Sequence, residues 1–189
     1  MFNIVVAFKT VFLYVVGLVT GVAQLGDIVY VICYRSPIIK MFTADTLSPL
    51  GERIHVEGMI SPWDIVACHS DRQLYVADWG GDCIWRVSVD DKSYVKWLTT
   101  VNVVSLSLTS HRLLVTSSPR SVRQYSTTDK QQLRDVLLPE YMKEVLHSVE
   151  TLRQTFIVSH RGTSRDEEQF AVSELFTFCC VLKYHQVDN

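Results

Sequence analysis

A chain of 189 residues is long enough to bury one sizeable hydrophobic core, and its composition excludes several classes of protein. Hydrophobic residues make up 48% of the chain and charged residues 20%, a balance that excludes an intrinsically disordered protein. The formal net charge of −2 also argues against a domain that binds polyanions through bulk positive charge.

A short apolar phrase centred on a valine recurs four times along the chain. The central valines, Val31, Val76, Val115 and Val158, lie 45, 39 and 43 residues apart. Self-similarity at this period is typical of β-propeller blades, each of which is a four-stranded antiparallel unit. The repeat therefore predicts an all-β protein, a β-propeller of about four four-stranded blades. The copies read VYVIC at 29–33, LYVAD at 74–78, LLVTS at 113–117 and FIVSH at 156–160.

Further β-type segments flank each copy at similar distances. An inner strand precedes each valine by nine or ten residues, a spacing that suits two strands joined by a tight hairpin. The register residues of the inner strands are Val22, Val66, Leu106 and Val149. An apolar-x-x-apolar pattern predicts third strands at Ile39–Phe42, Ile84–Val87, Val122–Tyr125 and Val172–Leu175. Fourth strands are expected at Arg53–Val56, Tyr94–Leu98, Leu133–Leu137 and Cys179–Lys183.

The apolar N-terminus allows two interpretations. The run Thr10–Val19, followed by small residues, resembles a signal peptide or a membrane anchor. A cut after Ala23 would, however, remove the inner strand of the first blade. We therefore expect Thr20–Leu25 to pair with Ile28–Tyr34 and the protein to be cytoplasmic, without stable membrane insertion. Secretion or anchoring through residues 1–23 is the alternative.

These elements divide the chain into an apolar lead-in and four blades, the last of which begins with a short helical linker at Glu140–Leu146. The lead-in spans 1–14, and the blades are expected at 15–60, 61–101, 102–139 and 140–189.

The five cysteines do not suggest a disulfide framework or a zinc site. Their number is odd, no pair has CxxC spacing, and Cys33, Cys68 and Cys83 fall inside apolar strands. The chain also has no Asn-x-Ser/Thr glycosylation acceptor, which favours an intracellular protein.

The second blade resembles an NHL repeat. The segments that carry the resemblance are Ser61–Ala67, Leu74–Asp78 and Cys83–Val87, while Gly80–Ile84 replaces the Asn-His-Leu signature itself. The other blades match only the spacing and the apolar skeleton, and related six-bladed YWTD and gluconolactonase-type propellers share these features. The resemblance implies an interaction platform, because NHL domains bind proteins or single-stranded RNA through loops on one face of a disc.

NHL-type rings usually have more than four blades, so the resemblance also implies an incomplete, open ring. An open arc would expose apolar strands at each end. We therefore expect the chain to self-associate or to take further blades from elsewhere.

The candidate binding residues are arginines and aromatic residues in loops that a propeller presents on one face. This residue combination is typical of protein-binding hot spots and of base-stacking sites. We predict a non-catalytic, protein-binding module, with a single-stranded RNA-binding domain and a calcium-dependent, lactonase-like hydrolase as alternatives. The residues are Arg35, Trp63, Trp79, Arg120, His160 and Arg161.

No catalytic residue, metal ligand or cofactor is predicted. Calcium-dependent propeller hydrolases need several converging oxygen ligands around the central channel. The inner strands offer only Gln24, Asp64, Ser105 and Glu150, for which turn capping is the alternative role. The chain contains no phosphate loop, HExxH motif or Ser-His-Asp order. Asp78 is expected to cap the turn that leads into Gly80 and Gly81.

Overall fold

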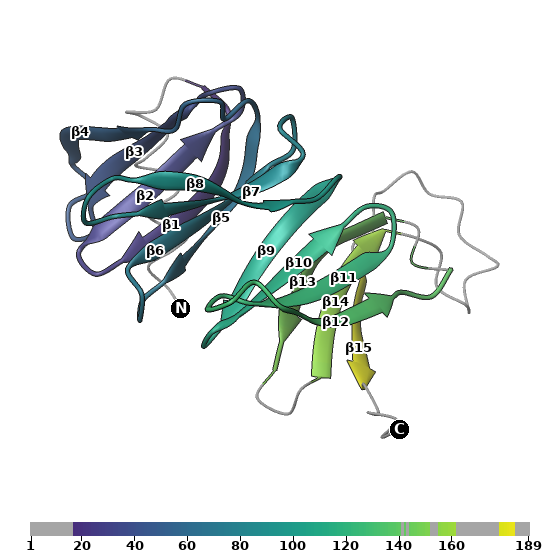
Figure 1. The fold of residues 1–189 in the computed structure, drawn as a ribbon. Helices are drawn as coiled ribbons and strands as arrows, with labels where there is room; N and C mark the ends of the chain where they lie inside the picture. The colour runs from purple at the N-terminus through teal and green to yellow at the C-terminus, as the bar shows by residue number, and fades with distance from the viewer. Residues whose placement is uncertain (1–16, 141, 143, 152–154, 162–177, 184–189) are drawn as a thin grey trace. The chain divides into compact units, whose positions relative to one another are not determined.

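The chain is all-β in the residues that a computed structural model describes, which are 17–140, 142, 144–151, 155–161 and 178–183. These residues form fifteen strands in four antiparallel sheets and contain no helix (Figure 1). Three sheets have four strands and one has three, and each sheet follows chain order. The predicted fold class and the four repeats are therefore confirmed. The sheets belong to two compact units, residues 1–101 and 102–189.

The first unit contains two four-stranded sheets. The first sheet has the order β1 (Val19–Leu25), β2 (Ile28–Cys33), β3 (Ile38–Thr43) and β4 (Pro49–His55). The second sheet has the order β5 (Pro62–Cys68), β6 (Gln73–Asp78), β7 (Cys83–Ser88) and β8 (Tyr94–Thr99). The predicted N-terminal hairpin is confirmed, because β1 pairs with β2 and Val22 lies opposite Val31.

The second unit contains one four-stranded and one three-stranded sheet. The former has the order β9 (Val103–Thr109), β10 (Arg112–Ser117), β11 (Ser121–Ser126) and β12 (Gln132–Leu137). The latter consists of β13 (Glu144–Glu150), β14 (Thr155–Arg161) and β15 (Phe178–Lys183).

Two expectations for the fourth blade are corrected. Glu144–Leu146 belong to β13 and not to a helical linker, because they pair with the end of β14. The segment expected to be the fourth strand, Cys179–Lys183, lies in β15 and pairs directly with β14 as the third strand of its sheet. The expected third strand, Val172–Leu175, lies outside the described residues.

The inner-strand register is as predicted in the first and third sheets and differs by one residue in the other two. Val76 lies opposite Ile65 instead of Val66, and Val158 lies opposite Ser148 instead of Val149. In the second sheet the pairing resumes across a four-residue connection, 69–72, whereas the first sheet uses a two-residue one. A one-residue shift exchanges the two faces of a strand, so Ile65 is buried where Val66 was expected.

The second strand of each four-stranded sheet is buried on both faces. In β2, β6 and β10 one half-buried residue is followed by five buried ones, and successive side chains of a strand point to opposite faces. The outer strands are largely exposed: β4 buries only Ile54, and β12 buries no residue. This gradient is expected for sheets that are covered by neighbours near their inner strands.

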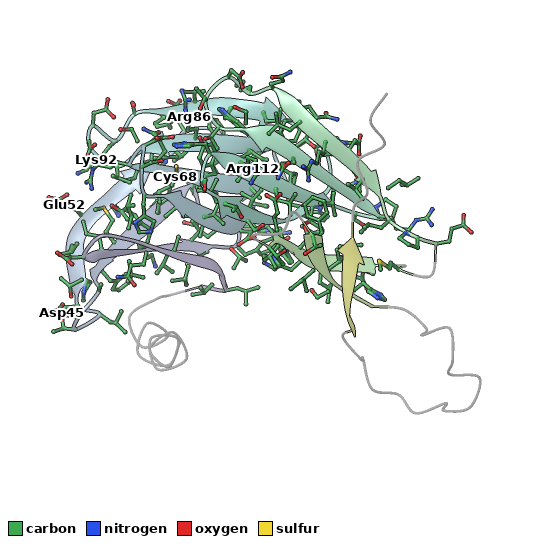
Figure 2. The ribbon with its side chains drawn as sticks, turned by 90° about the horizontal axis from the view of Figure 1, so that it is seen from below. Asp45, Glu52, Cys68, Arg86, Lys92 and Arg112 are labelled. Carbon is green, nitrogen blue, oxygen red and sulfur yellow. The ribbon has the colours of Figure 1, made fainter. Side chains whose placement is uncertain are left out.

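Within the first unit the two sheets pack closely through their inner strands. One hydrophobic cluster combines Tyr30 and Ile32 of the first sheet with Ile65 of the second. The Thr20 hydroxyl donates a hydrogen bond to the carbonyl oxygen of Pro62 (2.8 Å). At the outer strands the sheets are joined by an exposed ion pair between Lys92 and Glu52 (2.9 Å; Figure 2). Exposed pairs of this kind add little stability, so apolar packing holds the unit together.

We expect Gly21→Ala to lower the free energy of unfolding of the first unit by about 1–3 kcal/mol, the usual range for overpacking. A Cβ at Gly21 would lie 2.9 Å from Cγ2 and 3.0 Å from the backbone nitrogen of Ile65. All four tryptophans lie in this unit, so urea unfolding followed by tryptophan fluorescence reports on it. The control is Gly26→Asn, at φ +61° with no atom within 4 Å of a Cβ, which should change stability by only a few tenths of a kcal/mol. An equal effect of both variants would contradict the close approach.

Candidate functional site

Three of the predicted binding residues, Arg35, Trp63 and Trp79, lie together in the first unit. The Trp63 ring centroid is 6.2 Å from that of Tyr34, with the ring planes at 82°, and 6.3 Å from that of Trp79, with the planes at 46°. The guanidinium carbon of Arg35 lies 5.2 Å from the Tyr34 ring centroid, a cation–π contact. We call Tyr34, Arg35, Trp63 and Trp79 the aromatic patch.

The aromatic patch is open to solvent. Trp63 is 41% exposed and Trp79 is 48% exposed. Two exposed aliphatic residues extend the apolar surface: Leu18, whose carbonyl accepts a hydrogen bond from the Tyr34 backbone, and Ile60. Ile60 is adjacent to the turn after Trp79, because a Cβ on Gly80 would lie 3.0 Å from its Cγ2. Contiguous exposed apolar surface of this kind marks interaction sites.

Strand ends place the aromatic patch. Tyr34 and Arg35 follow β2, Trp79 follows β6, and Trp63 is the second residue of β5. The Trp79 backbone N–H donates to the carbonyl oxygen of Ser61 (3.0 Å), which fixes the turn after β6 against the chain that enters β5. Arg35 has φ 55°, in the left-handed region that favours glycine.

A buried carboxylate holds this end of the second sheet in place. Asp78 has an exposed fraction of 0% and accepts four hydrogen bonds. Its Oδ2 accepts from the backbone of Ile60 (2.9 Å) and from Nε1 of Trp85 (3.1 Å). Its Oδ1 accepts from the backbones of Ser61 (2.7 Å) and Gly81 (3.2 Å). The predicted turn-capping role of Asp78 is confirmed through Gly81.

Asp78 does more than the sequence indicated, because it also binds the segment before β5 and a tryptophan of β7. Trp63 lies two residues after Ser61, and Trp79 lies two residues before Gly81, so the bonds to Asp78 hold the backbone close to both tryptophans of the aromatic patch. The turn also leaves no room for a side chain at Gly81, where a Cβ would collide with the Asp78 carboxylate. No spacing rule indicates such contacts, since they join residues 17 and 18 positions apart.

The other three predicted binding residues belong to the second unit and differ in environment. Arg120 is 27% exposed in its side chain and lies 3.9 Å from Glu140 in an ion pair. The prediction of His160 as a loop residue is wrong, because His160 is a buried residue of β14 with an exposed fraction of 2%. The reason is that His160 is the last residue of its apolar phrase, the position that Cys33, Asp78 and Ser117 hold in the other three, and all four are buried at the ends of paired strands. His160 pairs with Val145 and Phe178 on either side. Arg161 ends β14, and its side chain lies outside the described residues.

The polar residues considered for a metal site form hydrogen bonds with other residues of the chain. Gln24 donates to the carbonyl of Gly26, and Asp64 accepts from the backbone of Ile65. The Ser105 hydroxyl bonds Nδ1 of His147, a side chain whose pKa is lowered by burial. Among the residues that the structure describes, no group of three or more His, Cys, Asp or Glu side chains could hold a metal ion.

Glu150 is a second buried carboxylate, with its side chain 1% exposed. Nε2 of Gln124 donates to its Oε2 (2.7 Å), while Nη1 of Arg112 and Nη1 of Arg134 lie 3.4 Å and 3.8 Å from its Oε1. The carboxylate comes from β13 and its three partners from the neighbouring sheet of the same unit. A carboxylate matched by two guanidinium groups is a structural link between sheets.

In the described part of the chain, no helix is long and apolar enough to cross a membrane.

Comparison with known proteins shows the fold and nothing finer. No family model and no curated protein matches the chain. Solved structures that resemble it include Kuenenia stuttgartiensis hydrazine synthase (12% identity, TM-score 0.64, 77% of this chain and 42% of that one). A chain of the nidogen–laminin complex (17% identity, TM-score 0.61) is covered over 57% of its length by 76% of this one. The computationally designed Ika4 protein (11% identity, TM-score 0.59) is covered over 92% by 88% of this chain.

The resemblance to β-propeller structures supports the propeller fold. The chain spans about half the length of the first two of these proteins. Its four sheets are consistent with an incomplete propeller of about four blades.

We expect Asp78→Ala to destabilise the first unit by about 3 kcal/mol, because four donors lose their common acceptor and three of them are backbone N–H groups. Asp78→Asn should restore little of this loss, since its amide nitrogen would face two donors. Urea unfolding followed by tryptophan fluorescence measures both variants. The matched control is Asp90→Asn, which removes one exposed ion pair with Arg72 and should cost less than 1 kcal/mol. A stable Asp78→Asn protein would contradict this role.

The stability of the first unit should fall as the pH rises from about 9 to 11. Burial, with a contribution from the Asp78 charge, raises the pKa of the Cys83 thiol from 9.0 to about 11. In that window the unfolded chain releases the thiol proton and the folded chain keeps it, so deprotonation favours unfolding. Unfolding at pH 8, 9 and 10 should show a smaller fall for Cys83→Ala than for the parent protein. Equal falls would exclude Cys83 as a source of the pH dependence.

Proposed function

We propose that the chain is an NHL-like propeller segment that acts as a non-catalytic, protein-binding module through the aromatic patch. The observation that supports this most directly is the contact series Arg35–Tyr34–Trp63–Trp79, in which the two tryptophans are close to half exposed. Tryptophan, tyrosine and arginine are the residues most enriched at protein-binding hot spots. The tryptophan and tyrosine side chains lose little conformational entropy on binding, because each has only two rotatable bonds.

The local scaffold is suited to this role. The two tryptophans of the patch sit at strand ends held by the Asp78 carboxylate and by the bond from Trp79 to Ser61. A surface whose side chains are held by rigid strands binds with a smaller loss of freedom than a mobile loop. The rigid framework and the exposed rings together favour a preformed binding surface.

Single-stranded RNA is the second candidate, since aromatic rings and arginine also stack on bases. Two observations favour protein over RNA. The aromatic patch contains one cationic side chain, Arg35, and the formal net charge of the chain is −2. Affinity for nucleic acid depends strongly on the number of phosphates neutralised, and one arginine supplies a small part of that.

Photo-crosslinking tests the proposal in cells that make the protein. A benzophenone amino acid at Ile60, beside the aromatic patch, should give protein adducts of discrete mass. The same probe at Val95, an exposed residue of β8 in the same unit, should not. The adducts at position 60 should disappear when Trp63→Ala or Trp79→Ala is introduced, because removal of a hot-spot residue costs about 2 kcal/mol, or roughly 30-fold in affinity.

Adducts of equal yield at both positions, or adducts at position 60 that survive both tryptophan substitutions, would contradict binding through the aromatic patch. Far-ultraviolet circular dichroism and urea unfolding of each variant check that the fold is retained. The tryptophan substitutions should be tolerated, since both side chains are exposed to a large extent.

A further inference from the structure

We infer that the aromatic patch binds an extended peptide segment that carries a carboxylate side chain and, two residues further on, a large apolar side chain. This inference rests on the proposed protein-binding function and adds the chemistry of the partner. It follows from the aromatic contact of Arg35, which has no ion pair among the described residues, and from the distances and angles between the rings.

Arg35 offers its charge to a ligand. Its guanidinium carbon lies over the ring of Tyr34, 5.2 Å from the ring centroid. Arg35 is exposed, and the N–H edge of a guanidinium group matches a carboxylate in a two-bond arrangement. Among the described residues, no carboxylate forms an ion pair with the Arg35 side chain.

Several other arginines in the described part of the chain have carboxylate partners. Arg72 pairs with Asp90 at 2.7 Å, and Arg112 lies 3.4 Å from Glu150. Arg35 therefore differs from these residues in having an aromatic contact but no ion pair within the described part of the protein. Charge complementarity then favours an acidic group on the partner.

The spacing of the patch fits an extended chain. Successive centres along the patch are 5.2 Å (Arg35 to Tyr34), 6.2 Å (Tyr34 to Trp63) and 6.3 Å (Trp63 to Trp79) apart. In an extended strand, side chains on one side repeat every second residue, about 6.8 Å apart. A carboxylate at one position can therefore reach Arg35 while apolar side chains two and four residues later contact the rings. The expected pattern is Asp or Glu, any residue, apolar, any residue, apolar.

The ring orientations argue against successive stacked bases. The planes of Tyr34 and Trp63 are nearly perpendicular, and those of Trp63 and Trp79 are 46° apart. Consecutive bases stack on exposed faces of aromatic rings. Rings that are inclined to one another instead offer both edges and faces, which suit branched aliphatic or aromatic side chains.

Selection from a random linear peptide library displayed on phage, with the full chain as bait, tests the inference. We expect enrichment of the acid-x-apolar-x-apolar pattern. A fluorescein-labelled Asp-Ala-Leu-Ala-Leu peptide should then bind in an anisotropy titration, and Arg35→Glu should weaken its binding at least about tenfold, because a charge-assisted hydrogen bond is lost. A Lys-Ala-Leu-Ala-Leu peptide should bind the Arg35→Glu variant more tightly than the parent protein.

Arg35→Gly is the control for folding, because φ 55° suits glycine better than arginine. This variant should unfold at the same or a higher urea concentration than the parent, yet bind the acidic peptide as weakly as Arg35→Glu. Unchanged binding by either variant would overturn the inference.

The remaining outcomes separate this inference from the proposed function. Enriched peptides that lack an acidic residue but lose binding with Trp63→Ala would overturn the inference and leave protein binding intact. If no peptide is enriched and a 20-nucleotide oligouridine binds with an affinity that falls with salt, both are overturned in favour of RNA. If neither ligand binds and no position-dependent crosslinks form, both are overturned as well.

Discussion

The buried carboxylate of Asp78 is the interaction on which the first unit and its aromatic patch depend. It accepts hydrogen bonds from the chain that enters β5, from the turn after β6 and from the Trp85 indole of β7. Removing a buried acceptor that has four donors is costly, because several buried N–H groups then lose their hydrogen-bond partner at once. Through these bonds one side chain fixes the backbone next to both Trp63 and Trp79.

The second unit also contains a buried carboxylate with several partners, but the partners differ in kind. Glu150 is also a buried carboxylate, but two of its neighbours are guanidinium groups of Arg112 and Arg134. Asp78 receives neutral backbone and indole donors at a strand end, whereas Glu150 joins strands of adjacent sheets. Both carboxylates follow from one constraint, which is that sheets buried on both faces can admit a charge only where several partners surround it.

Fold and function are supported by separate observations in this protein. The fold is shown by the four antiparallel sheets and by structural similarity to β-propellers at 12–17% identity. Propellers carry many unrelated functions, so that similarity says nothing about what the chain binds. A protein partner is favoured by the exposed rings and by Arg35, which the fold positions but does not require.

The sequence by itself determined the repeat, the strands of the first three blades and the presence of aromatic and cationic residues at strand ends, because these depend on local periodicity. It placed the inner-strand register one residue off in two sheets, since connection lengths and bulges set pairing. Only the tertiary structure decided which candidates meet. Tyr34 and Trp63 are distant in the chain yet in contact, while His160, the last residue of its phrase, is buried in a strand that pairs on both sides. Contact and burial depend on packing between segments, which no local pattern encodes.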